Sequence, residues 1–308
     1  MRALGLLLCF AACDAGVKPA PPPPAPKPPG PKVIVTRTDF DLSYLPADSD
    51  LVFHFDVKAL RAAKLWPAYA SRTSKWLMRG LPKCDYDPLS DTTDVMMGVA
   101  LESQHPVLVF HGIDRDKLMK CLRAAGAGVD PSVTIDGDFV TLSKSTGRSD
   151  MLQLVDAHTV VMQLDHPTKE SFAQLVGSPL LADAAMVAEL KRAPSGVAIT
   201  MVSRPDSKAL AKKWAIGGHV RRVSGTLSLT HRLDAQFVTV LGSAEEAAQL
   251  DKAMQGQLEN AQVKQMFDRL KARAQGDTIT MEVGMTEKQL ANLVTMIDGM
   301  LGGVSLPD

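Results

Sequence analysis

The 308-residue chain carries 34 Lys and Arg residues against 34 Asp and Glu residues, so its formal net charge is zero. A neutral chain has no overall field that would attract nucleic acid, and we expect no nucleic-acid partner. Aromatic residues make up only 5%, so the core should be aliphatic and rich in methionine, and the length suffices for one large domain or two ordinary ones.

The first thirteen residues predict export. Arg2 gives a positive start, the run from Ala3 to Phe10 is apolar, and two alanines precede Cys13. Because a helix needs about twenty apolar residues to cross a bilayer, this run is too short for a permanent transmembrane segment. The order resembles the signal peptides of bacterial lipoproteins, in which the cysteine is acylated and becomes the first mature residue. The resemblance implies a signal peptide over residues 1–12 and a palmitate-type anchor on Cys13, with inner and outer membrane both open. An ordinary secretory signal, cleaved after a small residue near Ala11 or Ala12, is the alternative.

Residues 13–41 are predicted to hold the lipidated cysteine and a proline-rich linker. Nine of the thirteen positions from Pro19 to Pro31 are proline. Proline fixes φ and has no N–H, so this segment should be extended polyproline II rather than helix or sheet. At ~3.1 Å per residue it reaches roughly 40 Å. We interpret it as a spacer; a ligand for a proline-reading domain is the alternative.

Past Pro46 the chain repeats one sequence pattern, in which a short apolar run is followed by a stretch with helical periodicity. Each run is short and rich in Val, Ile, Phe or Thr, which favours a strand. The six runs are Leu51–Phe55, Val107–Phe110, Thr159–Leu164, Val197–Val202, Phe237–Leu241 and Thr278–Val283. Three further strand-like runs have no helix attached and should close hairpins, at Asp94–Leu101, Val133–Ser143 and Val220–Thr230.

Capping residues predict where helices begin. Ser243 with Glu246, and Thr286 with Gln289, fit the capping box, in which two side chains satisfy two free backbone N–H groups. Other caps are expected at Asp114, Thr168 and Asp206. Residues 245–274 should be helical for much of their length, with a break at Gly256.

The order strand, helix, strand, strand, helix, strand occurs in residues 51–143 and again in residues 197–283. This is the split βαβ, ferredoxin-like order, with helices on one face of an antiparallel sheet. We therefore predict an α+β protein of two ferredoxin-like repeats, over residues 42–181 and 182–308, the second beginning with a linking helix at Ala182–Arg192. Ile199-Thr200-Met201 recurs as Ile279-Thr280-Met281, but so short a match also arises by chance, and a true repeat stays open.

Besides the predicted lipid site Cys13, the mature chain would keep two cysteines, Cys84 and Cys121. Two leftover cysteines in an oxidising compartment usually pair, so we expect a Cys84–Cys121 disulfide. Closing a loop of this length could contribute ~3 to 4 kcal/mol. A reactive thiol is the alternative, although no C-x-x-C motif accompanies either cysteine.

The sequence lacks G-x-S-x-G, P-loop and G-x-G-x-x-G motifs, and its seven histidines show no H-E-x-x-H or i, i+4 spacing. We therefore expect no catalytic residue, cofactor or metal. His54 alternates with Phe53 and Phe55, so it should face water while the phenylalanines face the core; an acid/base pair of His54 with Asp56 is the alternative.

Two other sets of residues have a structural interpretation. The carboxylate pairs Asp85/Asp87 and Asp136/Asp138 lie in turn-like settings and are assigned to turns. A set of methionines is expected to fill gaps in the core rather than to line a binding groove. These methionines are Met96, Met97, Met186, Met201 and Met281.

The proline-rich tether, the stretch from Leu45 to Asp48 before the first strand, and the cysteine pair together resemble poorly characterised envelope lipoproteins. The resemblance implies no activity. We expect a non-catalytic lipoprotein, anchored to a bacterial membrane and facing the periplasm, that binds a partner protein, a cell-wall component or a lipid. A periplasmic hydrolase, whose site comes from residues distant in the sequence, is the alternative.

Overall fold

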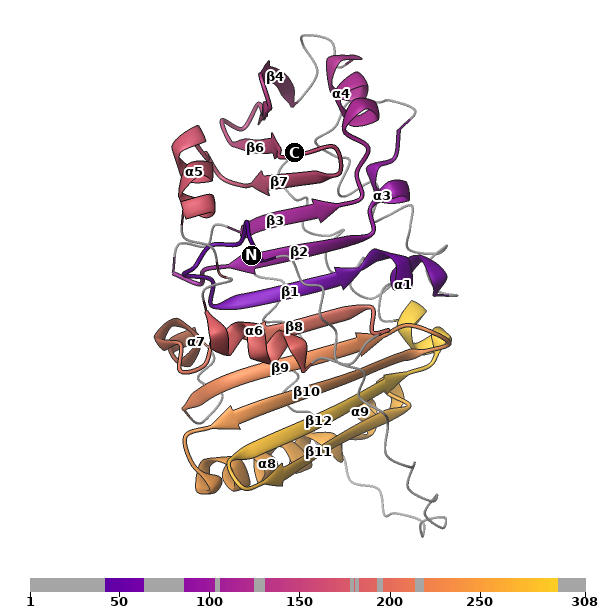
Figure 1. Ribbon diagram of the computed structural model, residues 1–308. Helices are drawn as coiled ribbons and strands as arrows, with labels where there is room; N and C mark the ends of the chain where they lie inside the picture. Colours follow the sequence, from indigo (N-terminus) through magenta and orange to yellow (C-terminus); the bar gives the residue numbers. More distant parts are fainter. Residues whose placement is uncertain are drawn as a thin grey trace. The chain divides into compact units, whose positions relative to one another are not determined.

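The computed structural model describes residues 42–63, 86–102, 106–124, 131–177, 180, 183–192, 196–213 and 219–292. These residues contain a twelve-stranded sheet in which every pair of neighbouring strands is antiparallel (Figure 1). Along the sheet the strands follow the order β11-β12-β10-β9-β8-β1-β2-β3-β7-β6-β5-β4. The predicted α+β class with antiparallel pairing is therefore confirmed.

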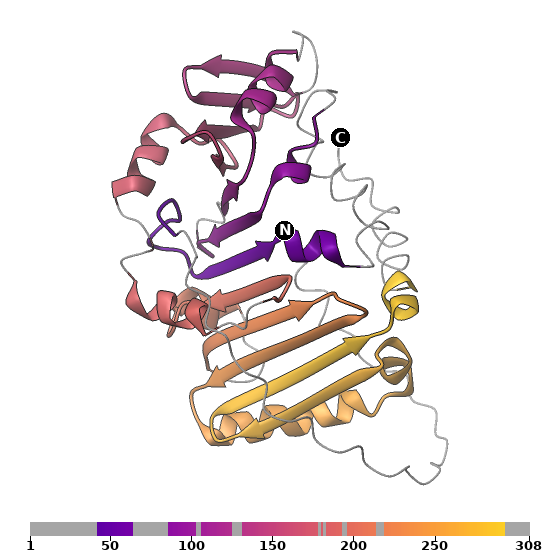
Figure 2. The ribbon, with the colours of Figure 1, turned by 45° about the vertical axis from the view of Figure 1, so that its right-hand side comes forward.

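Seven strands come from the first half of the chain. They are β1 (Leu51–Asp56), β2 (Asp94–Val99), β3 (Pro106–His111), β4 (Ser132–Asp136), β5 (Phe139–Ser143), β6 (Ser149–Leu154) and β7 (Thr159–Gln163). The second half adds β8 (Ile199–Ser203), β9 (Val220–Ser228), β10 (Leu233–Leu241), β11 (Arg269–Gln275) and β12 (Thr278–Met285). Because β1 pairs with β8 over five residues, the two halves share one hydrogen-bonded sheet (Figure 2).

Helices connect the strands in both halves. In the first half these are α1 (Val57–Ala62), α3 (Pro88–Asp91), α4 (Arg115–Ala124) and α5 (Lys169–Gly177). From the linking helix onward they are α6 (Ala184–Lys191), α7 (Lys208–Lys213), α8 (Ala244–Leu258) and α9 (Ala261–Met266), and residues 287–292 are also helical. The linking helix predicted at Ala182–Arg192 is confirmed as α6.

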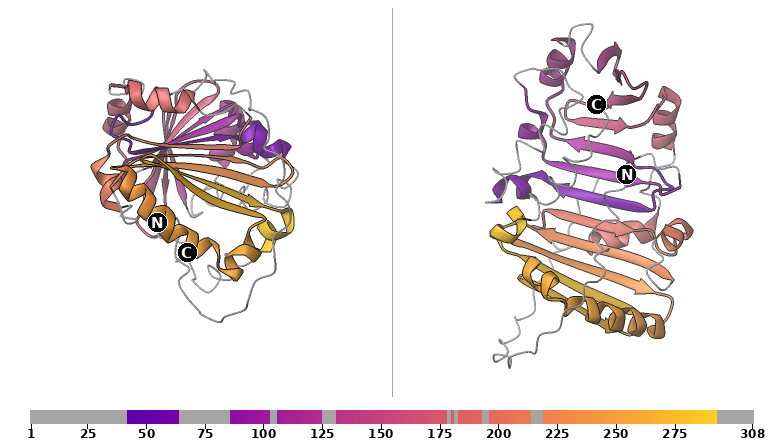
Figure 3. Two further views of the ribbon diagram at one scale, coloured as in Figure 1. Left: turned by 90° about the horizontal axis from the view of Figure 1, so that it is seen from below. Right: turned by 180° about the vertical axis from the view of Figure 1, so that it is seen from behind.

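Helices cover both faces of the sheet. On one face, Phe172 of α5 and Met186 of α6 pack against Val52 and Met96. On the other, Leu122 of α4 packs on the first half, and Ala247 of α8 packs on the second. We call these the α6 face and the α8 face; α6 and α8 lie on opposite sides of the strands (Figure 3).

The ferredoxin-like part of the fold prediction is not confirmed. In a split βαβ unit a third strand lies between the two strands that a helix joins. Here β1 and β2, on either side of α1, are direct neighbours, as are β8 and β9, on either side of α7. The expected one-sided helix layer is also wrong, because α5 and α6 lie opposite α4 and α8. Element order along the chain left both points undetermined, since it does not say which strands become neighbours.

The structure confirms some of the predicted helix boundaries and contradicts others. The box at Thr286 and Gln289 forms in full, since each backbone N–H donates to the other residue's side chain (3.3 and 2.9 Å). Asp206 is not the cap of its helix; the Ser207 hydroxyl accepts from Leu210 N–H instead, at 3.1 Å. Residues 245–274 are helical for much of their length, as predicted, in α8 and α9. The break predicted at Gly256 is wrong, because α8 continues through it, and Arg269–Gln275 forms the edge strand β11.

Candidate functional site

The predicted anchor and disulfide residues are only partly within the described structure. Cys13 and Cys84 lie outside the described residues. Cys121 lies on α4 and is buried, with 3% of its surface exposed. The acyl anchor and the Cys84–Cys121 bond therefore stay predictions. Among the described residues, no helix is both long and apolar enough to cross a membrane.

One row of side chains crosses the α8 face from strand to strand. The pairing register places Met97 opposite Phe53, and Phe53 opposite Met201. In full the row runs Met162, Leu108, Met97, Phe53, Met201, Gly225, Phe237, Met281 and Ala272. Because strands lie ~4.8 Å apart, these nine positions extend over roughly 38 Å. We call this set the methionine row.

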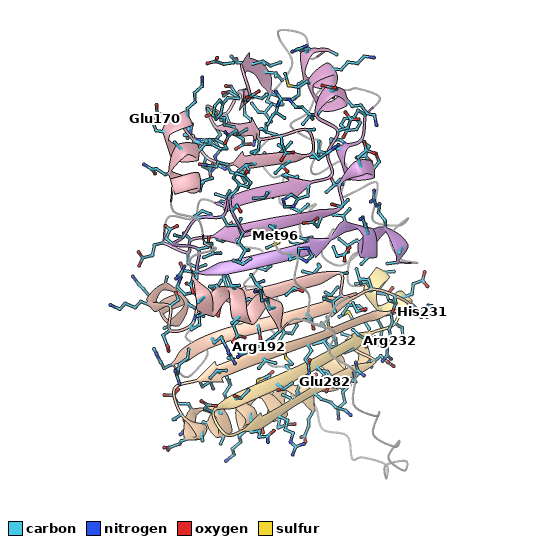
Figure 4. The ribbon with its side chains drawn as sticks, in the orientation of Figure 1. Met96, Glu170, Arg192, His231, Arg232 and Glu282 are labelled. Carbon is cyan, nitrogen blue, oxygen red and sulfur yellow. The ribbon has the colours of Figure 1, made fainter. Side chains whose placement is uncertain are left out.

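From β7 to β8 the methionine row is less buried than the opposite face of the same strands. From β9 to β11 the opposite face is itself half-buried or exposed, at Thr226, Gln236, Glu282 and Lys271. Six members keep part of their surface exposed, namely Met162, Leu108, Met97, Phe53, Phe237 and Met281. On the α6 face, the adjoining row is at most 3% exposed and consists of Val161, Val109, Met96, His54 and Thr200. Figure 4 labels Met96 near the middle of the sheet. The cluster that contains α4 and the cluster that contains α8 adjoin at β1, where Phe55 packs on the first and Phe53 on the second.

A glycine shapes the second half of the row. A Cβ atom at Gly225 would lie 2.7 Å from Cδ1 of Phe237, so the absence of a side chain lets the Phe237 ring lie across β9. In the first half, the Phe53 and Phe55 rings stack at 6.3 Å between centroids and 18° between planes. These two contacts place aromatic rings on the α8 face in both halves of the sheet.

A hollow of about 560 Å³ lies at the edge strand β11, where the methionine row ends at Ala272. It is lined by residues from α8, α9, β11 and β12: Gln255, Leu258, Glu259, Lys264, Leu270, Lys271, Ala272, Arg273, Thr280 and Glu282. Figure 4 labels Glu282 in this part of the sheet. The lining combines an apolar floor with charges of both signs.

Two histidines meet a carboxylate on the α6 face. His111 Nδ1 lies 2.9 Å from Asp94 Oδ1, and His54 Nε2 lies 3.9 Å from the same oxygen. The Thr93 hydroxyl donates to Asp94 Oδ2 at 2.9 Å. The His54 side chain is 4% exposed and that of Asp94 is 28% exposed, so solvent reaches the cluster from the Asp94 side.

The cluster holds Asp94 as a carboxylate. Burial by itself would raise its pKa, but the hydrogen bond to His111, the charge of His111, the Thr93 hydroxyl and the charge of His54 together keep the pKa below its usual value. Among the described residues, no group of three His, Cys, Asp or Glu side chains has an arrangement suited to a metal ion. The chemistry that this cluster offers is therefore proton exchange and hydrogen bonding.

His54 contradicts its predicted exposure. It is 3% exposed, whereas Phe53 and Phe55 keep part of their surface accessible. The alternation along β1 was correct, but it could not tell which face of the sheet would be packed more tightly. Asp56 caps α1 by accepting from Ala59 N–H at 2.9 Å.

The predicted turn carboxylates serve local structure. Asp87 caps α3 by accepting from Leu89 N–H at 3.0 Å. Asp136 and Asp138 flank Gly137 at the β4–β5 turn and pair with Lys169 and Arg115, each at 2.5 Å. Asp85 lies outside the described residues.

The methionines divide into two groups. Met96 and Met186 are fully buried, as core residues should be, and Met201 is 9% exposed. Met97 and Met281 belong to the half-buried row, together with Met162, which the sequence did not single out. These methionines lie on β2, β7 and β12, whereas Phe53 and Phe237 lie on β1 and β10. Only the cross-strand register joins them, and the sequence alone does not show that register. Asp94 and His111 were missed because they lie on different strands.

No protein family and no curated protein matches this chain. Among solved structures, crystal form III of TP0453 is similar at a TM-score of 0.50 and 9% identity, covering 84% of this chain and 99% of that one. Crystal form I of TP0453 gives a TM-score of 0.49 and 11% identity, covering 84% and 98%. At this identity the likeness concerns the fold alone.

Proposed function

We propose that this chain is a non-catalytic lipoprotein of the bacterial cell envelope, anchored through Cys13 and binding a partner through its folded part. The anchor and periplasmic location rest on the order of residues 1–13. The tether at Pro19–Pro31 would hold the sheet away from the membrane. The partner is an envelope protein, a cell-wall component or a lipid that offers an apolar surface.

The methionine row is the observation that carries the binding function. A run of half-buried Met and Phe side chains offers apolar area to a partner, and methionine adapts its flexible side chain to different shapes. On β7, β3, β2, β1 and β8 the neighbouring residues on the α6 face are at most 3% exposed, whereas Met162, Met97 and Phe53 on the α8 face keep accessible surface. The accessible surface of the methionine row is therefore the part of the protein that would contact the partner.

A pull-down from detergent-solubilised envelope tests this function. The bait is the full chain, compared with Met97→Gln/Met162→Gln, which keeps side-chain length but makes the row polar. Gln236→Met is the matched control, because Gln236 is exposed and lies on the α6 face of β10 beside Phe237. We expect the double variant to lose partners that the wild type and the control retain. Identical capture by all three baits would refute the role of the row.

Fatty-acid labelling tests the anchor separately. The wild-type chain should incorporate a radioactive fatty acid, and Cys13→Ala should not. Label in both chains, or in neither, would contradict acylation at Cys13.

A hydrolase is the second candidate, favoured by the approach of His54 and His111 to Asp94. Such a cluster could move a proton if a substrate reached the exposed side of Asp94. Turnover of a panel of chromogenic esters that disappears in His111→Gln would support this candidate over pure binding.

A further inference from the structure

The hollow at β11 gathers cations from two elements. Lys264 belongs to α9, whereas Lys271 and Arg273 belong to β11, and all three are exposed. Within the described part of the chain none of these three has an ion-pair partner within 4.0 Å. Their charges are therefore available to a ligand.

Two carboxylates in the same lining, Glu259 and Glu282, offset part of these charges and leave one positive charge in excess. Glu282 Oε2 lies 3.6 Å from Nε of Arg269, a residue outside the lining. Arg269 also pairs with Asp234 at 2.8 Å. Glu259 is the other lining carboxylate, so the hollow has an excess of positive charge and favours an anion.

The floor of the hollow is apolar and its strand edge is partly blocked. Leu258, Leu270 and Ala272 contribute the apolar surface. Because side chains alternate along β11, Leu270 and Ala272 lie on the face opposite Lys271 and Arg273, so the hollow spans the open edge of the sheet. The Gln255 side chain donates to the Ala272 carbonyl at 2.9 Å, which occupies an edge group that an added peptide strand would use. A volume of about 560 Å³ lies within the range of ~300 to 1,000 Å³ typical of small-ligand sites. These features fit a compact ligand better than a strand.

We propose that this hollow binds an anionic amphiphile. Its phosphate or carboxylate end lies against Lys264, Lys271 and Arg273, and the beginning of its alkyl chain crosses the open edge of β11 to Leu258 and Leu270. This inference goes beyond the proposed function, because the site lies at the edge strand β11, away from Met97 and Met162, and needs no envelope partner.

Isothermal titration of the full chain carrying Cys13→Ala with dodecyl phosphate, below its micelle concentration, tests the site. We expect saturable binding that weakens about tenfold in Lys271→Glu/Arg273→Glu, the effect of losing two contacts of ~0.7 kcal/mol each. Lys252→Glu is the control, because Lys252 is exposed on α8 but lies outside the lining. Its affinity should match that of the parent chain.

Two further ligands separate the sources of binding. If inorganic phosphate binds as tightly as dodecyl phosphate, the alkyl chain contributes nothing and the site binds only anions. If dodecylphosphocholine binds equally tightly, the net negative charge contributes nothing and the site binds only the apolar chain. Either result overturns the proposal, as does an unchanged affinity in the double variant. If the double variant does not fold, the salt dependence of the parent chain's affinity replaces it as the test. Because salt screens charges, the affinity for dodecyl phosphate must fall as NaCl rises from about 50 to about 500 mM. The pull-down outcome is independent of all these readouts.

Discussion

Asp94 connects two strands of the first half through side chains rather than through the backbone. It lies on β2, its partner His111 lies opposite on β3, and His54 approaches from β1. A carboxylate in this position keeps its charge because its neighbours favour the ionised form. At the scale of single residues, this cluster is where the protein should respond most directly to acid.

The lowered pKa of Asp94 fixes the direction of that response. A carboxyl group whose pKa is lower in the folded state stabilises the fold above its ordinary pKa of about 3.9, and the contribution is lost as the pH falls through the lowered value. Asp94→Asn should cost about 1 to 2 kcal/mol at pH 7 and flatten the loss of stability between about pH 5 and pH 2. Urea unfolding at several pH values measures both effects.

Asp48→Asn serves as the control for the acid response, because Asp48 is exposed on a surface turn. Its profile should follow the wild type. An Asp94→Asn profile as steep as the wild-type one would show that other groups control acid stability.

Two glycines show how an element's surroundings decide the effect of the same substitution. Gly225 lies in β9 under the Phe237 ring, whereas a Cβ atom at Gly256 in α8 would have no other atom within 4 Å. The first position is therefore closed to a methyl group and the second is open.

Gly225→Ala should lower the free energy of unfolding by about 1 to 3 kcal/mol, because the added methyl collides with Phe237. Gly256→Ala should raise it by about 0.5 to 1 kcal/mol, because alanine restricts the unfolded chain and favours helix. Thermal or urea denaturation measures both. Replacing Phe237 by Leu should recover part of the Gly225→Ala loss; the absence of any recovery would contradict the assigned collision.

At the scale of the whole molecule, the β1–β8 pairing makes one sheet out of two halves. Five residue pairs join the strands, and buried residues flank the junction on both faces, including Val52, Val202 and Leu51. Separating the halves would expose two central strand edges together with this core. We therefore expect the halves to unfold together rather than as independent domains.

Core truncations in each half test that expectation. Leu118→Ala on α4 and Leu210→Ala on α7 remove side chains that are 2% and 0% exposed, and each should cost about 2 to 5 kcal/mol. Circular dichroism and hydrogen exchange of β5 and β10 during urea titration should report one shared transition, shifted by either variant. Two transitions, each moved by only one variant, would contradict a common folding unit.

Local signals explain which parts of the fold were predictable. Each of the six apolar runs overlaps a strand, since β-branched and aromatic residues between turns favour extended backbone. β11 was missed because Arg269-Leu270-Lys271-Ala272-Arg273 has the composition of a helix, and it is pairing with β12 that makes it a strand. Local propensity gives way there to hydrogen bonds with a neighbour that follows two residues later.

The sequence by itself determined the α+β class, most strand positions, the linking helix and the expectation of an acylated Cys13, because each depends on residues close together in the chain. Only the tertiary structure decided the strand order, the burial of His54, the meeting of His111 with Asp94, and the methionine row. The reason is physical: periodicity shows which side chains share a face, whereas register and packing determine what lies beside that face and how deeply it is covered.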